Sequence, residues 1–200
     1  ASELTMSIIQ IVRQKVFIQS LILAAVIFVA GLVLGALIGQ STIEGLINQL
    51  GGLLGPLAPS GGLSILLLLL LFINNALKTL GMVVLGILVG IPPLLFVGLN
   101  GFIIGGVGSM LESANGWRYA VASLAPHGII EIAVVLLATA LGLTIGVQSI
   151  KWLVRRESRV KMQLSDCLKV YLRWVLPGLA LAAIIEIFVT PRLIGLASGG

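Results

Sequence analysis

The stretch FIQSLILAAVIFVAGLVLGALIG, residues 17–39, contains no charged side chain. A helix needs about 20 consecutive apolar residues to cross a bilayer, so this stretch predicts a membrane-spanning helix. Over the whole chain 58% of the residues are hydrophobic and 10% are charged, whereas soluble domains carry about 25% charged residues. The composition therefore excludes a water-soluble globule and predicts an all-α, polytopic membrane protein.

Further apolar stretches bring the expected number of membrane-spanning helices to about five. We expect one transmembrane domain over residues 1–200, with spans at about 17–39, 63–90, 93–111, 126–149 and 171–189. Pro92-Pro93 predicts a tight turn before the third span, because proline is favoured at helix starts. The alternative partition has spans at about 62–78 and 79–98, followed by a re-entrant half-helix over 99–111.

Small residues recur at every fourth position within the predicted spans. Such spacing lets the backbones of two membrane helices approach closely, so we expect glycine-rich packing throughout the core. Residues 3–16 and 40–62 have the pattern of amphipathic helices, which we expect at the inner and outer membrane interfaces. The small-residue stripes are Gly31, Gly35 and Gly39, then Gly101, Gly105 and Ser109, then Ala138, Gly142 and Gly146.

Basic residues concentrate in the loop 150–170, between the fourth and fifth spans. Because positive loops favour the cytoplasmic side, we expect a cell-membrane protein with a cytoplasmic amino terminus and an external carboxyl terminus. The loop predicts a cationic amphipathic helix that binds anionic lipids on the inner leaflet, or a docking surface for a cytosolic partner. It joins two spans, so we do not expect nucleic-acid binding. The candidate lipid- or partner-binding residues are Lys151, Arg155, Arg156, Arg159 and Lys161.

Ionisable residues inside the spans are candidates for function, since burying them in a bilayer is costly. His127 and Glu131 stand one helical turn apart, so they share a face of the fourth span. Glu186 lies near the outer end of the fifth span, at a predicted depth in the membrane similar to that of Glu131. Two neighbouring carboxylates favour a shared proton or a bridging cation. The predicted intramembrane polar network also includes Asn74, Asn75 and Asn100.

The order of these motifs resembles the stage II sporulation protein M family of integral membrane proteins. The resemblance implies a multi-span fold, and the family's namesake implies a membrane anchor that gathers peptidoglycan-degrading enzymes during engulfment. It is carried by Asn74-Asn75, Gly90, Asn100-Gly101, Gly105, Pro126-His127-Gly128 with Glu131, Glu186 and Thr190-Pro191.

Three functions are consistent with these residues. The leading hypothesis is a non-enzymatic, homo-oligomeric membrane scaffold that binds other membrane or cytosolic proteins. The alternative is a cation or proton transporter or channel that uses Glu131 and Glu186, with His127 at its entrance. A third is an intramembrane hydrolase with His127 and Glu131 as acid–base groups, although the sequence has no HExxH pattern. We predict no cofactor, but a divalent cation could bind between His127, Glu131 and Glu186.

Overall fold

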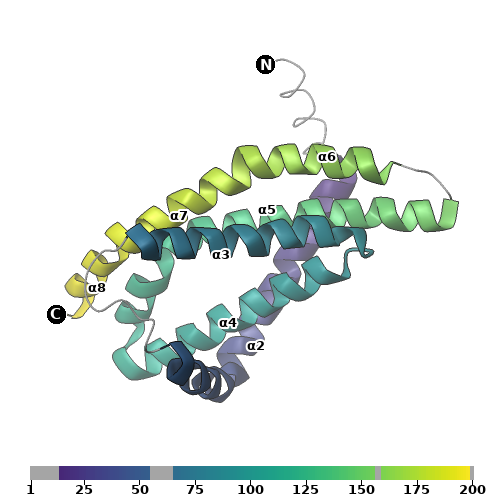
Figure 1. The fold of residues 1–200 in the computed structure, drawn as a ribbon. Helices are drawn as coiled ribbons and strands as arrows, with labels where there is room; N and C mark the ends of the chain where they lie inside the picture. Colours follow the sequence, from purple (N-terminus) through teal and green to yellow (C-terminus); the bar gives the residue numbers. More distant parts are fainter. Residues whose placement is uncertain (1–13, 55–64, 156–158, 199–200) are drawn as a thin grey trace.

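The computed structural model describes residues 14–54, 65–155 and 159–198, almost all of them helical (Figure 1). The described residues form no strand, and five of their helices are long and apolar enough to cross a membrane. This confirms the predicted all-α, multi-span architecture. The five candidate spans are Lys15–Ile38, Leu68–Ile87, Ile91–Asn115, Gly128–Arg155 and Val160–Leu196.

The described residues contain seven α-helices. They are α2 (Lys15–Leu54), α3 (Ile65–Val84), α4 (Ile91–Asn115), α5 (Trp117–Arg155), α6 (Val160–Val170), α7 (Leu176–Phe188) and α8 (Thr190–Ser198). A 3₁₀ turn, η2 (Leu85–Ile87), follows α3, and a π-helical segment, η3 (Tyr171–Val175), joins α6 to α7. The helix α4 runs unbroken through residues 99–111.

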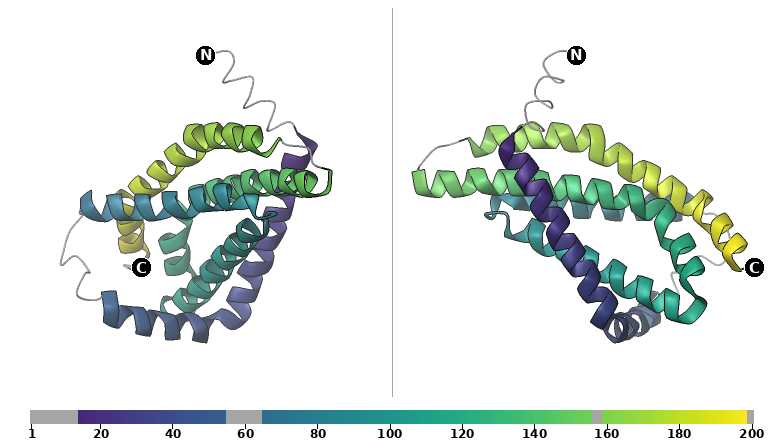
Figure 2. Two further views of the ribbon diagram at one scale, coloured as in Figure 1. Left: turned by 45° about the vertical axis from the view of Figure 1, so that its right-hand side comes forward. Right: turned by 180° about the vertical axis from the view of Figure 1, so that it is seen from behind.

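The helices form two groups that diverge toward one end of the molecule. In Figure 1, α3, α6, α7 and most of α5 run along one another, while α4 slants away and packs against α2. Figure 2 shows α2 crossing the outside of this arrangement. The start of α2, the α3–α4 turn, the end of α5 and the start of α6 lie at one end, and the α4–α5 junction and α8 lie at the other.

The two segments that we predicted as interfacial helices are continuous with helices that contain candidate spans. The helix α2 extends beyond the candidate span Lys15–Ile38 to Leu54 and changes direction on the way (Figure 2); residues 40–54 contain no proline to end it. The basic segment 150–170 is divided between the end of α5 and the start of α6. The helix α5 runs antiparallel to α6 and α7, since Cys167 of α6 contacts Leu141 and a Cβ on Gly178 of α7 would meet Val134. The predicted helix over 3–16 lies largely outside the described residues.

Backbone contact between α2 and α4 occurs at the predicted glycine stripes. A Cβ built on Gly105 would lie 2.9 Å from the backbone nitrogen of Ala36, and one on Gly101 would likewise meet the main chain of α2. From the other side, Cβ atoms on Gly31 and Gly35 would overlap the main chain of α4. Without side chains between them the two helices gain extensive van der Waals contact, which is a main source of helix association in lipid.

A second glycine contact joins the end of α3 and the following turn to α5. A Cβ on Gly86 would lie 2.7 Å from the Cα of Gly142, and one on Gly146 would lie 2.7 Å from the Cα of Gly90. The stripe at the carboxyl-terminal half of α5 therefore fixes the turn between α3 and α4. As with α2 and α4, small residues at both surfaces allow the approach.

The α3–α4 turn itself contains two consecutive residues with left-handed backbones. Gly90 has φ 78° and Val89 has φ 52°. Glycine adopts this region freely, but a β-branched residue there is strained by about 1–3 kcal/mol. The helix α4 then begins at Ile91 with a proline in its first turn, where the missing N–H costs nothing. The Pro-Pro break predicted from sequence thus follows a strained turn.

Fully buried apolar side chains from α3, α4, α5, α6 and α7 form the core between the helices. These buried side chains form one contiguous cluster. The largest of them are Met82, Val83, Val97, Leu141, Ile145, Val170 and Leu179.

Candidate functional site

A cavity of about 590 Å³ lies between α4 and the first part of α5. Its walls are mostly apolar, but Asn100 of α4 and Glu131 of α5 both line it, and Glu112 and Trp117 line it as well. Asn100 and Glu131 also line a second, very small cavity of about 10 Å³, where Phe28 of α2 joins them. The structure therefore brings an amide and a carboxylate together at the meeting point of three helices.

The shape of α5 positions Glu131 at this cavity. The helix contains Pro126, which lacks a backbone N–H and interrupts the helical hydrogen bonds. Figure 1 shows α5 changing direction in this part of the chain, as is common at proline. The part before the bend lies against α4, and the part after it runs beside α3. Glu131 follows the proline closely, so it lies where the two directions of α5 meet.

The side chain of His127 lies outside the described parts of the structure, although its main chain belongs to α5. Its predicted position beside Glu131 therefore stays a prediction. Within the described residues, no group of three His, Cys, Asp or Glu side chains is arranged to hold a metal ion. A cation bound between His127, Glu131 and Glu186 likewise remains a prediction.

Glu186 lies near the end of α7 and is half-buried. Both α7 and α8 pack against α5, as the proposed proximity of the fourth and fifth spans requires. However, the described residues that line the two cavities at Glu131 do not include Glu186. The pairing of Glu131 with Glu186 therefore stays a prediction.

The paired asparagines of α3 lie apart from the Asn100–Glu131 cavity. Asn74 is exposed and Asn75 is half-buried, as expected for neighbours that point about 100° apart on a helix. The main-chain carbonyl of Asn75 accepts a hydrogen bond from the Thr79 hydroxyl at 2.7 Å. Asn100 lines the cavity, whereas Asn74 and Asn75 are not among its described lining residues.

A buried polar contact between α3 and η3 escaped the sequence analysis. The Tyr171 hydroxyl donates a hydrogen bond to the Ala76 carbonyl oxygen at 2.7 Å and lies 3.3 Å from the Thr79 hydroxyl. Tyr171 is the first residue of the π-helical segment, and such segments occur frequently at functional sites. Its only signal in the sequence was a polar aromatic residue at the predicted start of the fifth span.

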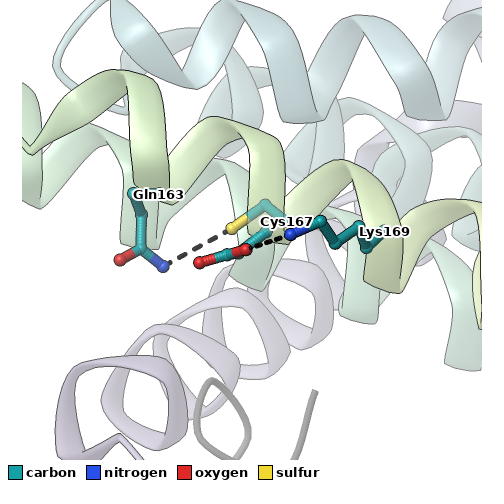
Figure 3. A network of polar contacts seen from close by, with 4 residues as sticks. Gln163, Cys167 and Lys169 are labelled. Atoms are coloured by element: carbon teal, nitrogen blue, oxygen red, sulfur yellow. Dashed lines mark hydrogen bonds and ion pairs between the residues drawn. The ribbon is translucent and has the colours of Figure 1, made fainter. Parts of the chain in front are cut away.

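The basic segment is attached to α5 through the buried face of α6. Gln163 donates a hydrogen bond to the Cys167 sulfur at 3.6 Å (Figure 3), and the Cys167 thiol points to the Leu141 carbonyl oxygen at 3.8 Å. The Lys169 ammonium pairs with Asp166 at 2.7 Å on the same helix. Among the predicted lipid- or partner-binding residues, Lys151 is half-buried, Arg156 lies outside the described residues, and the exposed ones are Arg155, Arg159 and Lys161.

Comparison with known proteins identifies the family. The family model Stage II sporulation protein M matches residues 24–191. No curated protein and no solved structure matches the chain. The matched range contains both glycine contacts, the Asn100–Glu131 cavity and the basic segment. The chain belongs to the stage II sporulation protein M family and is a multi-pass membrane protein.

Proposed function

We propose that this protein is a non-enzymatic scaffold of the cell membrane, which associates with itself and holds other membrane or cytosolic proteins. The observation that carries the proposal is the pair of glycine contacts, one between α2 and α4 and one between the α3–α4 turn and α5. Together they connect α2 to α5 through α4 and the turn that precedes it.

Main-chain contact limits how far these helices can move. A Cβ on Gly35 would lie 2.8 Å from the Cα of Phe102, so sliding α2 along α4 would drive larger residues into the same space. Close-packed interiors respond to such overlap with a large loss of stability. Transport by alternating access needs one group of helices to rock against another. A locked core suits an assembly role, in which a fixed surface is presented to partners.

The proposed orientation follows the charges at the two ends. The start of α2, the end of α5 and the start of α6 lie at the same end of the molecule (Figure 1). The basic residues at this end are Lys15, Lys151, Arg155, Arg159 and Lys161. Positive residues favour the cytoplasmic side, so we place this end inside the cell. The carboxyl terminus is then external.

The outer face of α2 is our proposed surface for self-association. It carries a shallow groove of about 700 Å³, and the described residues that line it are all aliphatic. The exposed members of the groove include Val26, Val29 and Val33, at 59%, 55% and 47%. A helix of a second copy could pack into this groove by the dispersion contacts that drive association in lipid.

Cysteine cross-linking in native membranes tests the scaffold. On a Cys167→Ala background, Val29→Cys should form a disulfide-linked dimer on mild oxidation, since the two copies of α2 would face each other. The matched control is Leu77→Cys, which replaces a residue of α3 that is 64% exposed but lies outside the groove. Equal dimer yields at the two positions, or none at Val29→Cys, would contradict self-association through α2.

Cation or proton transport is the second candidate, favoured by the cavity that Asn100 and Glu131 share. If it operates, reconstituted vesicles with a pH- or cation-sensitive dye should show flux that Glu131→Gln abolishes. Asp166→Asn is the control, because that carboxylate pairs with Lys169 on α6, away from the cavity. The scaffold proposal expects no protein-dependent flux in any of these vesicles.

A further inference from the structure

We propose that a groove at the basic end of the molecule binds one anionic phospholipid, with an acyl chain against its apolar walls and the phosphate at Lys161. The groove has a volume of about 580 Å³ and lies between the α3–α4 turn, the end of α5 and the start of α6. Its walls include Leu88 and Val89 of the turn, Trp152 and Leu153 of α5, and Leu164 of α6.

Apolar side chains form most of this groove and stay open to the surroundings. Leu88 is 57% exposed, Leu153 is 59% exposed and Trp152 is 44% exposed. Tryptophan is enriched where membrane helices meet the head-group layer. The groove thus offers a hydrocarbon-like wall at the depth where a lipid chain meets its polar head.

Positive charge surrounds the same opening from two helices. Lys161 lines the groove directly. On α5, Arg155 is exposed and follows Trp152 by three residues, which places both on one helix face. On α6, Arg159 is exposed and immediately precedes the helix. Basic pockets between helices on the cytoplasmic side are typical binding sites for anionic lipid head groups.

The wall contributed by the α3–α4 turn is preformed. Val89 lines the groove with a left-handed backbone, at φ 52°, a conformation that a β-branched residue keeps only where its surroundings enforce it. The enforcement comes from Gly90, which packs against Gly146 and Leu143 of α5. Strain of this kind concentrates at ligand sites, so the turn supports a binding role for the groove.

The combination of groove and charge selects the chemical class of the ligand. A soluble phosphate has the charge but leaves the apolar walls uncovered, and a zwitterionic lipid covers the walls but brings no net charge to Lys161. An anionic phospholipid satisfies both features. The site is independent of the α2 surface used in the scaffold proposal, so either can fail alone.

Fluorescence quenching of Trp152 provides the test. The double variant Trp117→Phe, Trp174→Phe leaves Trp152 as the single tryptophan, because the chain has three. The full-length protein is reconstituted in phosphatidylcholine vesicles that contain either brominated phosphatidylglycerol or brominated phosphatidylcholine. We expect stronger quenching by the anionic lipid at equal mole fraction. Lys161→Gln should lower this preference about five-fold, the effect of removing one lysine's attraction to an anionic lipid.

A second variant separates a built groove from general attraction to the basic end. Leu88→Phe keeps every charge but fills part of the groove, so it should also reduce quenching by phosphatidylglycerol. The control Lys78→Gln removes an exposed lysine of α3 outside the groove and should leave the preference unchanged. Equal quenching by the two brominated lipids would overturn the proposal. So would a preference that survives both Lys161→Gln and Leu88→Phe, since it would then arise from the surface as a whole.

Discussion

Gly101 of α4 lies directly against the main chain of Phe28 in α2, so closely that a Cβ would not fit between them. The relationship joins residues that lie far apart in the sequence and recurs one turn later, where Gly105 meets Leu32. A side chain at either glycine must push the two helices apart. The glycine stripe therefore sets the distance between α2 and α4.

The first prediction concerns Gly101→Ala. The added methyl group should overpack the α2–α4 contact and lower the free energy of unfolding by about 1–3 kcal/mol. Gly98→Ala is the control on the same helix, because its Cβ would meet only a side-chain atom of Ile27 at 3.4 Å. That variant should be neutral or stabilising by about 0.5–1 kcal/mol. Unfolding in mixed micelles measures both, and equal stability of the two variants would contradict the contact.

The contact between α5 and the α3–α4 turn makes a parallel prediction. Gly142→Ala should destabilise the protein by about 1–3 kcal/mol, since its Cβ would collide with the main chain at Met82 and approach Pro93 Cγ to 2.8 Å. Gly128→Ala, on the same helix, meets nothing within 4 Å and serves as the control. Thermal denaturation in detergent should rank Gly142→Ala well below Gly128→Ala. The reverse ranking would argue against this packing.

The hydrogen bond from Tyr171 to α3 should contribute to stability. Tyr171→Phe removes the hydroxyl that donates to Ala76 and should cost about 1 kcal/mol, the usual net value of such a bond. Tyr119→Phe changes the other tyrosine of the chain, which is half-buried on α5, and should have a smaller effect. Measuring the free energy of unfolding of both variants tests this prediction. A Tyr171→Phe protein as stable as the parent would exclude the hydrogen bond as a stabilising contact.

Cysteine labelling tests two features, the burial of Cys167 and the proposed orientation of the protein in the membrane. Cys167 is completely buried, so a maleimide should modify the native protein only after denaturation. On a Cys167→Ala background, Val154→Cys should react with an impermeant maleimide only in inside-out vesicles. Asn115→Cys, at the opposite end, should react in intact cells. Labelling with the two sides exchanged would reverse the proposed orientation.

The membrane architecture was predictable because its signals are local. Apolar length predicts a spanning helix, and the spacing of Gly101 and Gly105 predicts a close helix contact. The helix start at Pro92-Pro93 follows from the geometry of proline. None of these requires knowledge of which helices are neighbours.

Features that depend on neighbouring helices were not predictable in the same way. Residues 40–54 and 150–155 have amphipathic patterns that suit either an interfacial helix or the extension of a spanning one. Packing against α5 then decides where α6 lies. The cavity that joins Asn100 to Glu131 depends on the bend of α5, and the bond from Tyr171 to α3 depends on the π-helical segment. Both are tertiary outcomes that sequence spacing does not encode.

In the scaffold that we propose, the α2–α4 pair and the α3–α5 pair form one rigid body. Electron paramagnetic resonance distance measurements can test this rigidity, with spin labels at Leu37→Cys of α2 and Leu77→Cys of α3 on a Cys167→Ala background. Both positions are open to a label, since Leu37 is 74% exposed and Leu77 is 64% exposed. We predict one narrow distance distribution in lipid, unchanged by pH or added cations. Two populations that exchange with pH or cation concentration would contradict the scaffold and favour transport through the Asn100–Glu131 cavity.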